Sequence, residues 1–348
     1  MNKKRIAIVR SDFHDKHSSS WGNEWIKYCE DNFYEFSLVD WRSLESFDEL
    51  VAHDIVLWHF SHYSQEEMLF ARSILQALKL AGCRVFPDLN DSLHFDDKVA
   101  QAYFFKSLGI QSPKNYPIHS KDSLEDWIKT VGIFPVVAKL RTGSGSANVK
   151  LINNINELRK YGNQMFDDGV NSTPSLYFKL KSNILSAKSF HDIYNRFKRV
   201  PEFLFSRKSA SRLSKEIGYV YLQEYISDVN YDLKIAVVRD RLSFVARGTR
   251  PGEFRASGGG TLFYDKSLVD DSIIKCAFSA YDSLGSDCTG FDMIKDPKTN
   301  KPVILEVSYG FSHIAQIQAN GYFDRNCNWH DEPLNPPYHL LDCIVKEL

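Results

Sequence analysis

Short apolar runs separated by amphipathic stretches occupy the first 90 residues. The longest amphipathic stretch repeats its apolar residues at helical spacing and ends before Gly82, a favourable residue just past a helix end. Strands that alternate with helices predict a parallel sheet with helices on both faces. The predicted strands are residues 5–9, 54–60 and 83–86, and the predicted helix is residues 66–80.

Beyond residue 95 the apolar pattern changes from alternating strands and helices to hairpins with single helices. Two stretches with helical spacing end before Gly109 and Gly285, and several strand-like runs are joined by polar loops, which is typical of antiparallel strands. The predicted helices are 95–108 and 272–284, the predicted strands are 134–140, 149–152 and 219–226, a hairpin over 232–249 turns at 239–241, and a coil over 321–337 precedes a short helix from Tyr338.

A second hairpin, over residues 290–308, places two carboxylates across from each other. If its strands pair symmetrically about Thr299, Asp292 lies opposite Glu306. Like charges in that position destabilise a strand pair, so a counter-charge is needed. Mg²⁺ is one candidate, because it takes oxygen ligands from one or two carboxylates and from phosphates. The alternative is that each carboxylate pairs with a Lys or Arg. The same register places Ile294 opposite Ile304, and Ser308 on the face of Glu306.

Two lysines and a Gly/Ser loop form a second candidate site. Lys139 lies in a predicted buried strand, and the loop 141–148 that follows offers backbone N–H groups to a phosphate. The loop is not a Walker A motif, because no Gly-Lys-Ser/Thr follows. Lys98 lies in the first turn of its predicted helix, where it opposes the helix dipole, which indicates a partner outside the helix. Ordinary hairpin loops and solvated lysines remain the alternative interpretation.

The composition is that of an ordinary globular protein. The chain has 348 residues, 43% of them apolar and 25% charged, with a formal net charge of -1, so it has no general attraction to nucleic acid or membrane. No apolar run has the length of a membrane span or a secretory signal, and the six cysteines have no metal-ligand spacing. We therefore expect a cytoplasmic protein with reduced thiols.

One segment, residues 160–215, has a charge unlike the remainder. It contains eleven Lys or Arg and four acidic residues, a net charge of +7, with aromatic residues interleaved. This pattern fits a surface that meets nucleic acid or a membrane. It also fits an amphipathic helical insertion whose basic face is solvated, and the sequence leaves both open.

Taken in order, these features resemble the ATP-grasp superfamily, most closely its RimK-like carboxylate–amine ligases. The resemblance covers about residues 95 to 315 and rests on the ordered set rather than on any single motif. It implies an α/β and α+β fold with a Rossmann-like preATP-grasp domain in residues 1–90. A lid subdomain with the basic insertion would follow in 91–218, and a C-terminal subdomain with the metal site in 219–348.

The resemblance also implies a role for each matching residue. The residues that would contact the ATP phosphates are Lys98, Lys139 and the loop residues Ser144, Gly145 and Ser146, and those that would contact the adenosine are Gln223, Glu224, Tyr225, Ile226 and Asp232. The catalytic residues at the transferred phosphoryl group would be Arg255 and Lys139. The ligands of Mg²⁺ or Mn²⁺ would be Asp292, Glu306 and Ser308.

The implied activity is an ATP-dependent ligase that joins a carboxylate to an amine through an acyl phosphate. Two positions depart from the family pattern: Ser308 replaces an Asn ligand, and Ser257 replaces the Asn of an Arg-x-Asn motif. Residues 306–311 resemble a branch linked to bacterial surface-polysaccharide synthesis, which implies a uronic-acid-type glycan or small carboxylate as substrate. Nucleic acid is not expected as a partner, membrane contact is at most peripheral, and the oligomeric state stays open. Another phosphoryl transfer, or nucleotide binding without catalysis, are the alternatives.

Overall fold

The computed structural model describes residues 4–11, 14–16, 19–62, 64–143, 148–171, 215–249 and 261–348. These residues form two compact units. Unit 1 consists of Met1–Ser61, Glu66–Pro113 and Ile226–Leu348, and unit 2 consists of His62–Gln65 and Lys114–Tyr225. The division into three sequence-defined domains stays a prediction.

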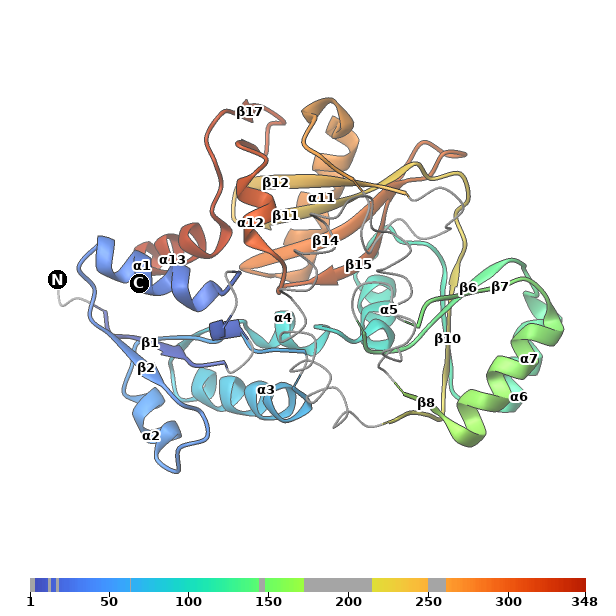
Figure 1. The fold of residues 1–348 in the computed structure, drawn as a ribbon, viewed down its shortest axis with the longest axis horizontal. Helices are drawn as coiled ribbons and strands as arrows, with labels where there is room; N and C mark the ends of the chain where they lie inside the picture. The colour runs from blue at the N-terminus through green and yellow to red at the C-terminus, as the bar shows by residue number, and fades with distance from the viewer. Residues whose placement is uncertain are drawn as a thin grey trace, which may run out of the picture. The chain divides into compact units, whose positions relative to one another are not determined.

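Unit 1 begins with a parallel sheet, as the alternating pattern predicts. Its strand order is β2-β1-β3-β4, and Figure 1 shows α1 on one face of this sheet and α2 and α3 on the other. The sheet residues of β1 and β3 are entirely buried, which is why they read as continuous apolar runs. The elements are β1 (Ile6–Val9), α1 (Trp21–Asp31), β2 (Phe36–Val39), α2 (Ser46–Val51), β3 (Ile55–Leu57), α3 (Gln65–Leu80), β4 (Arg84–Phe86), α4 (Leu89–Leu93) and α5 (Lys98–Ser107), with a 3-10 turn at His14–Lys16.

The second sheet of unit 1 is antiparallel, with the order β15-β14-β11-β12-β16-β17 and β13 paired to β12. Helix α11 ends at Gly285, which adopts the left-handed conformation (φ 64°) expected of that cap. The elements are β11 (Tyr231–Val238), β12 (Arg241–Gly248), β13 (Leu262–Phe263), α11 (Asp271–Leu284), β14 (Cys288–Lys295), β15 (Pro302–Ser308), α12 (His313–Ile317), β16 (Tyr322–Phe323), β17 (Trp329–His330) and α13 (Pro336–Glu347), with a 3-10 turn at Lys266–Leu268.

The C-terminal tail differs from its prediction. Residues 321–337 are not all coil, because β16 and β17 pair with each other and β16 extends the sheet at β12. Helix α13 begins at Pro336 rather than at Tyr338, since proline is well suited to a first helical turn. The tail strands are two residues each, too short for an alternating pattern to stand out in the sequence.

The carboxylate hairpin pairs as predicted at Asp292 and Glu306 and differs towards its loop. Asp292 lies opposite Glu306, which confirms that part of the register. The predicted pairing of Ile294 with Ile304 is wrong, because the register shifts after Asp292 and Ile294 faces Val303. Leu305 is the extra residue, and such a β-bulge adds local twist that a symmetric pairing rule cannot anticipate.

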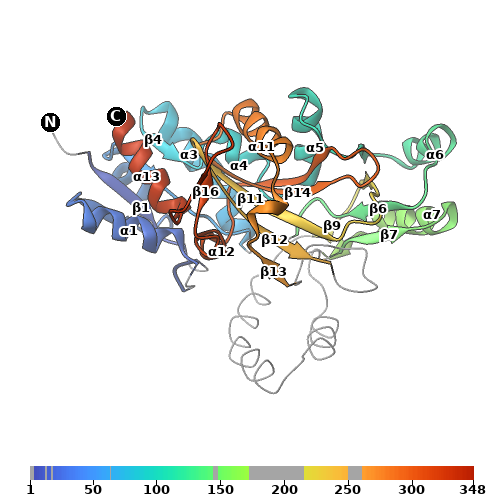
Figure 2. The ribbon, with the colours of Figure 1, turned by 90° about the horizontal axis from the view of Figure 1, so that it is seen from above.

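Unit 2 is built around the antiparallel sheet β5-β10-β6-β7. Figure 2 shows α6 and α7 side by side along this sheet, and both helices begin at a side-chain cap, Ser120 and Asn154 respectively. The elements are β5 (Asn115–Ile118), α6 (Lys121–Thr130), β6 (Val136–Lys139), β7 (Lys150–Ile152), α7 (Ile155–Asn163), a π-helical turn (Gln164–Asp168), β8 (Val170–Asn171), β9 (Lys215–Glu216) and β10 (Val220–Glu224).

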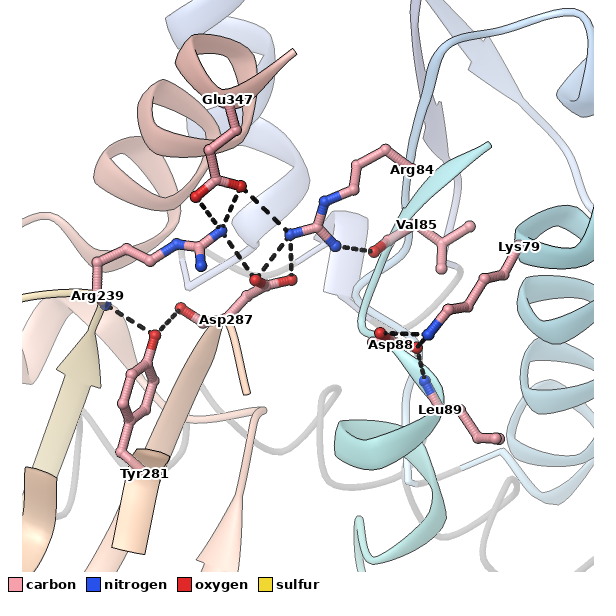
Figure 3. Close-up of polar contacts among 9 residues, drawn as sticks. All are labelled: Lys79, Arg84, Val85, Asp88, Leu89, Arg239, Tyr281, Asp287 and Glu347. Carbon is pink, nitrogen blue, oxygen red and sulfur yellow. Dashed lines mark hydrogen bonds and ion pairs between the residues drawn. The ribbon is translucent and has the colours of Figure 1, made fainter. Parts of the chain in front are cut away.

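An ion-pair cluster joins the two sheets of unit 1 (Figure 3). The Asp287 carboxylate receives Arg84 Nη2 at 2.7 Å and Arg239 Nη2 at 2.9 Å. Arg239 also pairs with Glu347 of α13 at 2.8 Å. Beneath the cluster, the Tyr281 hydroxyl accepts from the Arg239 N–H and donates to the Asp287 carbonyl. These contacts hold β4, the β11–β12 turn and the start of β14 in one fixed arrangement.

All six cysteines are free thiols, in keeping with the reduced state expected from their spacing. Within the described part of the chain, no helix combines the length and apolarity that crossing a bilayer requires. Most of the basic segment, residues 172–214, lies outside the described residues.

Candidate functional site

Helix α5 presents the first lysine of the site. Asp97 caps the helix by accepting from Ala100 N at 2.9 Å, which makes Lys98 the first helical residue. Lys98 Nζ lies 3.3 Å from Glu306 Oε1, and the lysine side chain is only 7% exposed. Burial acts to lower the pKa of Lys98, but the Glu306 and Asp96 carboxylates outweigh it and raise that pKa. The partner outside the helix that the sequence indicates is therefore Glu306.

Asp292 is held between two cations from neighbouring strands. Lys234 Nζ of β11 lies 2.8 Å from Asp292 Oδ1, and Arg247 Nη2 of β12 lies 3.2 Å from Asp292 Oδ2. Arg247 also forms a bidentate pair with Asp232, with its Nε 3.1 Å from Oδ1. Burial would raise the pKa of Asp292, but the charges of Lys234 and Arg247 hold it well below its ordinary value.

Strand register explains why these groups meet. Asp232 lies opposite Arg247 across β11–β12, Lys234 lies opposite Asp292 across β11–β14, and Asp292 lies opposite Glu306 across β14–β15. The chain thus pairs opposite charges across β11–β12 and across β11–β14. Asp292 and Glu306 are like charges across β14–β15, and each has its own cation partner. In this arrangement each carboxylate of the hairpin has a Lys or Arg partner, which is the alternative that the sequence left open.

Lys234 and Arg247 were not among the site residues predicted from the sequence. A usable signal was present: a two-residue turn at Arg239 and Asp240 sets Asp232 opposite Arg247. Placing Lys234 beside Asp292 required knowledge that β14 pairs with β11, a contact between segments more than 50 residues apart in the chain. The hydrophobic and polar pattern within either segment does not indicate that β11 pairs with β14.

The donor set fits a divalent cation that arrives with phosphate groups. Among the described residues, no group of three or more His, Cys, Asp or Glu side chains is arranged to hold a metal. Asp292 and Glu306 supply two carboxylates, and Mg²⁺ or Mn²⁺ completes such a shell with phosphate oxygens and water. Ser308 donates its hydroxyl proton to the Gly310 carbonyl at 2.7 Å, so its lone pairs are oriented away from that bond.

The loop after β15 is anchored to the first sheet of unit 1. Tyr309 is fully buried and donates to the Phe60 carbonyl at 3.2 Å, and Trp21 Nε1 donates to the Phe311 carbonyl at 3.1 Å. A Cβ at Gly310 would approach Phe95 to 3.1 Å, so the backbone is closely enclosed there. These contacts fix the backbone directly after Ser308, whose hydroxyl donates to the Gly310 carbonyl.

Unit 2 brings the second lysine beside the predicted adenosine segment. Lys139 Nζ donates to Gln223 Oε1 at 2.7 Å, and Gln223 Nε2 donates to Asn115 at 2.9 Å. Glu224 ends β10, where its backbone N–H donates to Lys114 O at 2.9 Å. Tyr225 is partly buried directly after this strand, and Ile226 is assigned to unit 1.

The start of the Gly/Ser loop is anchored within unit 2. Thr142 Oγ1 donates to Glu216 at 2.6 Å, and Arg141 N donates to the Tyr219 hydroxyl at 2.6 Å. Burial raises the pKa of Tyr219 far above its ordinary range, so that hydroxyl stays protonated and donates to Glu216 at 2.9 Å. Four of the predicted site residues, Ser144, Gly145, Ser146 and Arg255, lie outside the described residues.

Comparison with known proteins identifies the fold. No family model and no curated protein matches the chain. D-alanyl-alanine synthetase A from Vibrio cholerae O1 superposes over 100% of this chain and 98% of its own, with a TM-score of 0.59 and 12% identity. D-alanine–D-alanine ligase from Bacillus anthracis covers 99% and 96%, with a TM-score of 0.57 and 14% identity, and was also solved with ATP.

A further neighbour is N5-carboxyaminoimidazole ribonucleotide synthetase from Thermotoga maritima, with a TM-score of 0.53, 15% identity, and coverage of 92% of this chain and 73% of its own. These neighbours are ATP-grasp ligases. The chain has the ATP-grasp ligase fold. The fold class predicted from the sequence, a Rossmann-like sheet followed by antiparallel α+β parts, is confirmed.

Proposed function

We propose that this protein is an ATP-dependent carboxylate–amine ligase that forms a C–N bond and releases ADP and phosphate. The observation that carries the proposal is the charged set in unit 1, in which Lys98, Lys234 and Arg247 surround Asp292 and Glu306. Cations beside two carboxylates are what a metal-bound triphosphate needs, since the metal takes the carboxylates and the cations take the phosphates.

The proposal assigns the nucleotide as follows. Gln223, Glu224, Tyr225 and Ile226 meet the adenosine together with Asp232, and Lys139, Lys98 and the loop Ser144, Gly145 and Ser146 meet the phosphates. The bond from Lys139 Nζ to Gln223 supports this assignment, because it holds the lysine beside the adenosine segment. Asp232 accepts from Arg247 Nε at 3.1 Å, so its proposed adenosine contact would be made by a carboxylate that is also paired with a guanidinium.

In the proposed metal site, Asp292 and Glu306 are the carboxylate ligands and Ser308 contributes its hydroxyl directly or through water. A bound Mg²⁺ supplies charge that neutralises the β- and γ-phosphates. With a metal on the two carboxylates, Lys98 and Lys234 would pair with phosphate oxygens instead of with Glu306 and Asp292. The role of the protein is to hold each lysine ammonium group close to both its carboxylate partner and the proposed position of the phosphate oxygen.

The proposed reaction has two steps, both at the substrate carboxylate. A carboxylate oxygen attacks the γ-phosphorus, the β,γ P–O bond breaks, and ADP leaves. The amine then attacks the acyl carbon, the C–O bond to phosphate breaks, and inorganic phosphate leaves while the nitrogen loses a proton. Arg255 and Lys139 offset the charge on the transferring phosphoryl group, and phosphate is a better leaving group than hydroxide, which lowers the barrier to amide formation.

Calorimetric titration of ADP tests the nucleotide site, with Mg²⁺ and with EDTA, in the wild type and in Glu306→Gln. We expect binding that strengthens with Mg²⁺ in the wild type and loses that dependence in Glu306→Gln, which keeps shape but removes the ligand charge. A screen of carboxylates and amines for ADP release then tests the reaction. Absence of nucleotide binding in every condition contradicts the proposal, and binding without turnover in the screen favours a non-catalytic protein.

The substrate that we propose is an anionic carboxylate such as a uronic-acid unit of a bacterial surface glycan, modified in the cytoplasm. Its support is the net charge of +7 in residues 160–215 of a chain whose total is -1, because a local positive field raises the concentration of anions nearby. Turnover should then weaken as salt increases. A turnover rate that does not change with salt concentration, together with no binding of the protein to anionic liposomes, would count against this substrate class.

A further inference from the structure

Gln101 makes a bond pattern that only an amide can make. It is 2% exposed on α5, and its Nε2 donates to Val307 O at 2.9 Å and to His94 O at 2.8 Å. Its Oε1 accepts from Val307 N at 3.2 Å. One side chain therefore satisfies both backbone groups of a residue in β15 and also holds the segment before α5.

The hydrogen bonds of Gln101 to Val307 satisfy backbone groups at the edge of the sheet. In the described part of the chain β15 is the last strand of its sheet, so the backbone groups that point away from β14 need partners elsewhere. A primary amide carries a donor and an acceptor in the spacing of a peptide group, and Gln101 pairs with Val307 as a neighbouring strand would. The backbone N–H of Ile304, further along the same edge, donates to Gln111 O at 2.9 Å.

The contact lies between the two charged residues that the proposed site brings together. Lys98 is three residues before Gln101, so both side chains project from one face of α5. Glu306 is the residue before Val307 in β15. The Gln101 bonds thus join the helix turn that carries Lys98 to the strand residue beside Glu306, whose Oε1 lies 3.3 Å from Lys98 Nζ.

We propose that Gln101 is a positioning residue that sets the spacing between Lys98 and Glu306, and that this spacing couples metal binding to nucleotide binding. The inference rests on the proposed function. In the proposed site, Lys98 would contact a phosphate oxygen and Glu306 would contact the metal bound to that phosphate. The position of Lys98 relative to Glu306 along the direction of β15 therefore has to be fixed. Apolar contacts have little directional preference, so they alone would allow α5 to shift along β15 at a small cost in free energy. The hydrogen bonds from Gln101 to Val307 are directional and oppose that shift.

Other contacts support the same segment. Arg72 of α3 donates to Ser92 O and Phe95 O, each at 2.9 Å, and Asp97 caps α5. Helix α3 therefore holds both α4 and the segment between α4 and Lys98. Gln101 differs from these residues because its bonds reach β15, where they relate the helix turn that carries Lys98 to the strand that carries Glu306.

The test is calorimetric titration of ADP into full-length Gln101→Met, with Mg²⁺ and with EDTA. Methionine keeps the length of glutamine and removes every hydrogen bond. The readout is the ratio of Kd in EDTA to Kd in Mg²⁺, which measures the coupling. We expect this ratio to fall by about tenfold or more, the usual cost of losing a residue that orients a metal ligand, while Kd in EDTA changes much less.

Tyr281→Phe is the matched control. It removes a hydroxyl that bridges the Arg239 N–H and the Asp287 carbonyl (Figure 3). These groups lie just beyond Val238, the last residue of β11, whereas Asp292 pairs with Lys234 further along that strand. General loosening would lower the ratio in both variants, whereas positioning by Gln101 lowers it in Gln101→Met alone. If Gln101→Met does not fold, Gln101→Asn, which keeps the amide but cannot span the same distance, takes its place.

A folded Gln101 variant with the wild-type ratio overturns the inference, and so does an equal fall in Tyr281→Phe. Failure of the proposed function has a different signature, because the wild type itself would then bind no ADP. In that case the hydrogen bonds of Gln101 would serve only to close the edge of the sheet.

Discussion

Replacing Lys234 by methionine should produce a gain of metal binding in the absence of nucleotide. Lys234 Nζ lies 2.8 Å from Asp292 Oδ1, and the two side chains are 19% and 16% exposed. A metal that approaches Asp292 without nucleotide must displace this ammonium group. In Lys234→Met the carboxylate loses that competitor but keeps Arg247, so it remains ionised and accessible to a cation.

The expected gain can be bounded from the structure. Two unit charges 4 Å apart interact by about 4 kcal/mol at an effective dielectric constant of about 20. Part of this attraction between Lys234 and Asp292 is offset in the wild type, because the lysine ammonium group regains hydration when a metal displaces it from the carboxylate. A net gain of about 1.4 kcal/mol would already tighten binding about tenfold. We therefore expect Kd for Mn²⁺ or Mg²⁺ alone to fall by about tenfold.

Paramagnetic resonance of Mn²⁺, which distinguishes free from bound ion, is the assay, supported by calorimetry with Mg²⁺. Lys275→Met is the control, because Lys275 pairs with Asp271 on an exposed part of α11, where both side chains are about two-thirds exposed (67% and 69%). Affinity for ATP should meanwhile decrease, since one of the cations that we propose to bind phosphate is gone. Unchanged or weaker Mn²⁺ binding in Lys234→Met would refute the idea that cations hold the metal ligands until phosphate arrives.

Three further predictions follow from single residues. Lys139→Ala and Glu306→Gln should each abolish ADP formation in the presence of the true substrates, and full turnover in both would rule out the ligase site. Gly290→Ala should lower the melting temperature, because the new Cβ would lie 2.7 Å from Phe311 and 3.1 Å from Ser308 O; Gly290→Ala with normal stability would show that this enclosure relaxes easily. Burial raises the pKa of Asp91 from 3.8 to about 8, so the folded state holds a proton that the unfolded chain releases. The stability that this proton contributes is full below about pH 4 and is lost as pH rises towards 8. Urea unfolding should show a smaller loss between pH 5 and 8 for Asp91→Asn than for the wild type, and parallel curves would contradict the assignment.

Most of the secondary structure could be predicted because its signals are local. Buried strands such as β1 and β3 are continuous apolar runs, and helices such as α11 end at a glycine in the left-handed conformation. The pairing of Asp292 with Glu306 could be predicted as well, because a hairpin relates two segments through one short loop. The bulge at Leu305 could not, since it depends on how β15 twists against its neighbours.

The sequence by itself determined the ordered set of lysines, carboxylates and loop that points to a nucleotide ligase, because residue type and spacing decide which chemistry is available. Beyond the Asp292–Glu306 pair of the hairpin, only the tertiary structure decided which groups meet. Lys234 and Arg247 reach Asp292 through the pairing of β11 with β14 and β12, and Gln101 reaches Val307 across 206 residues. Such contacts depend on sheet order and helix placement, which arise from the burial of the whole core rather than from any local pattern.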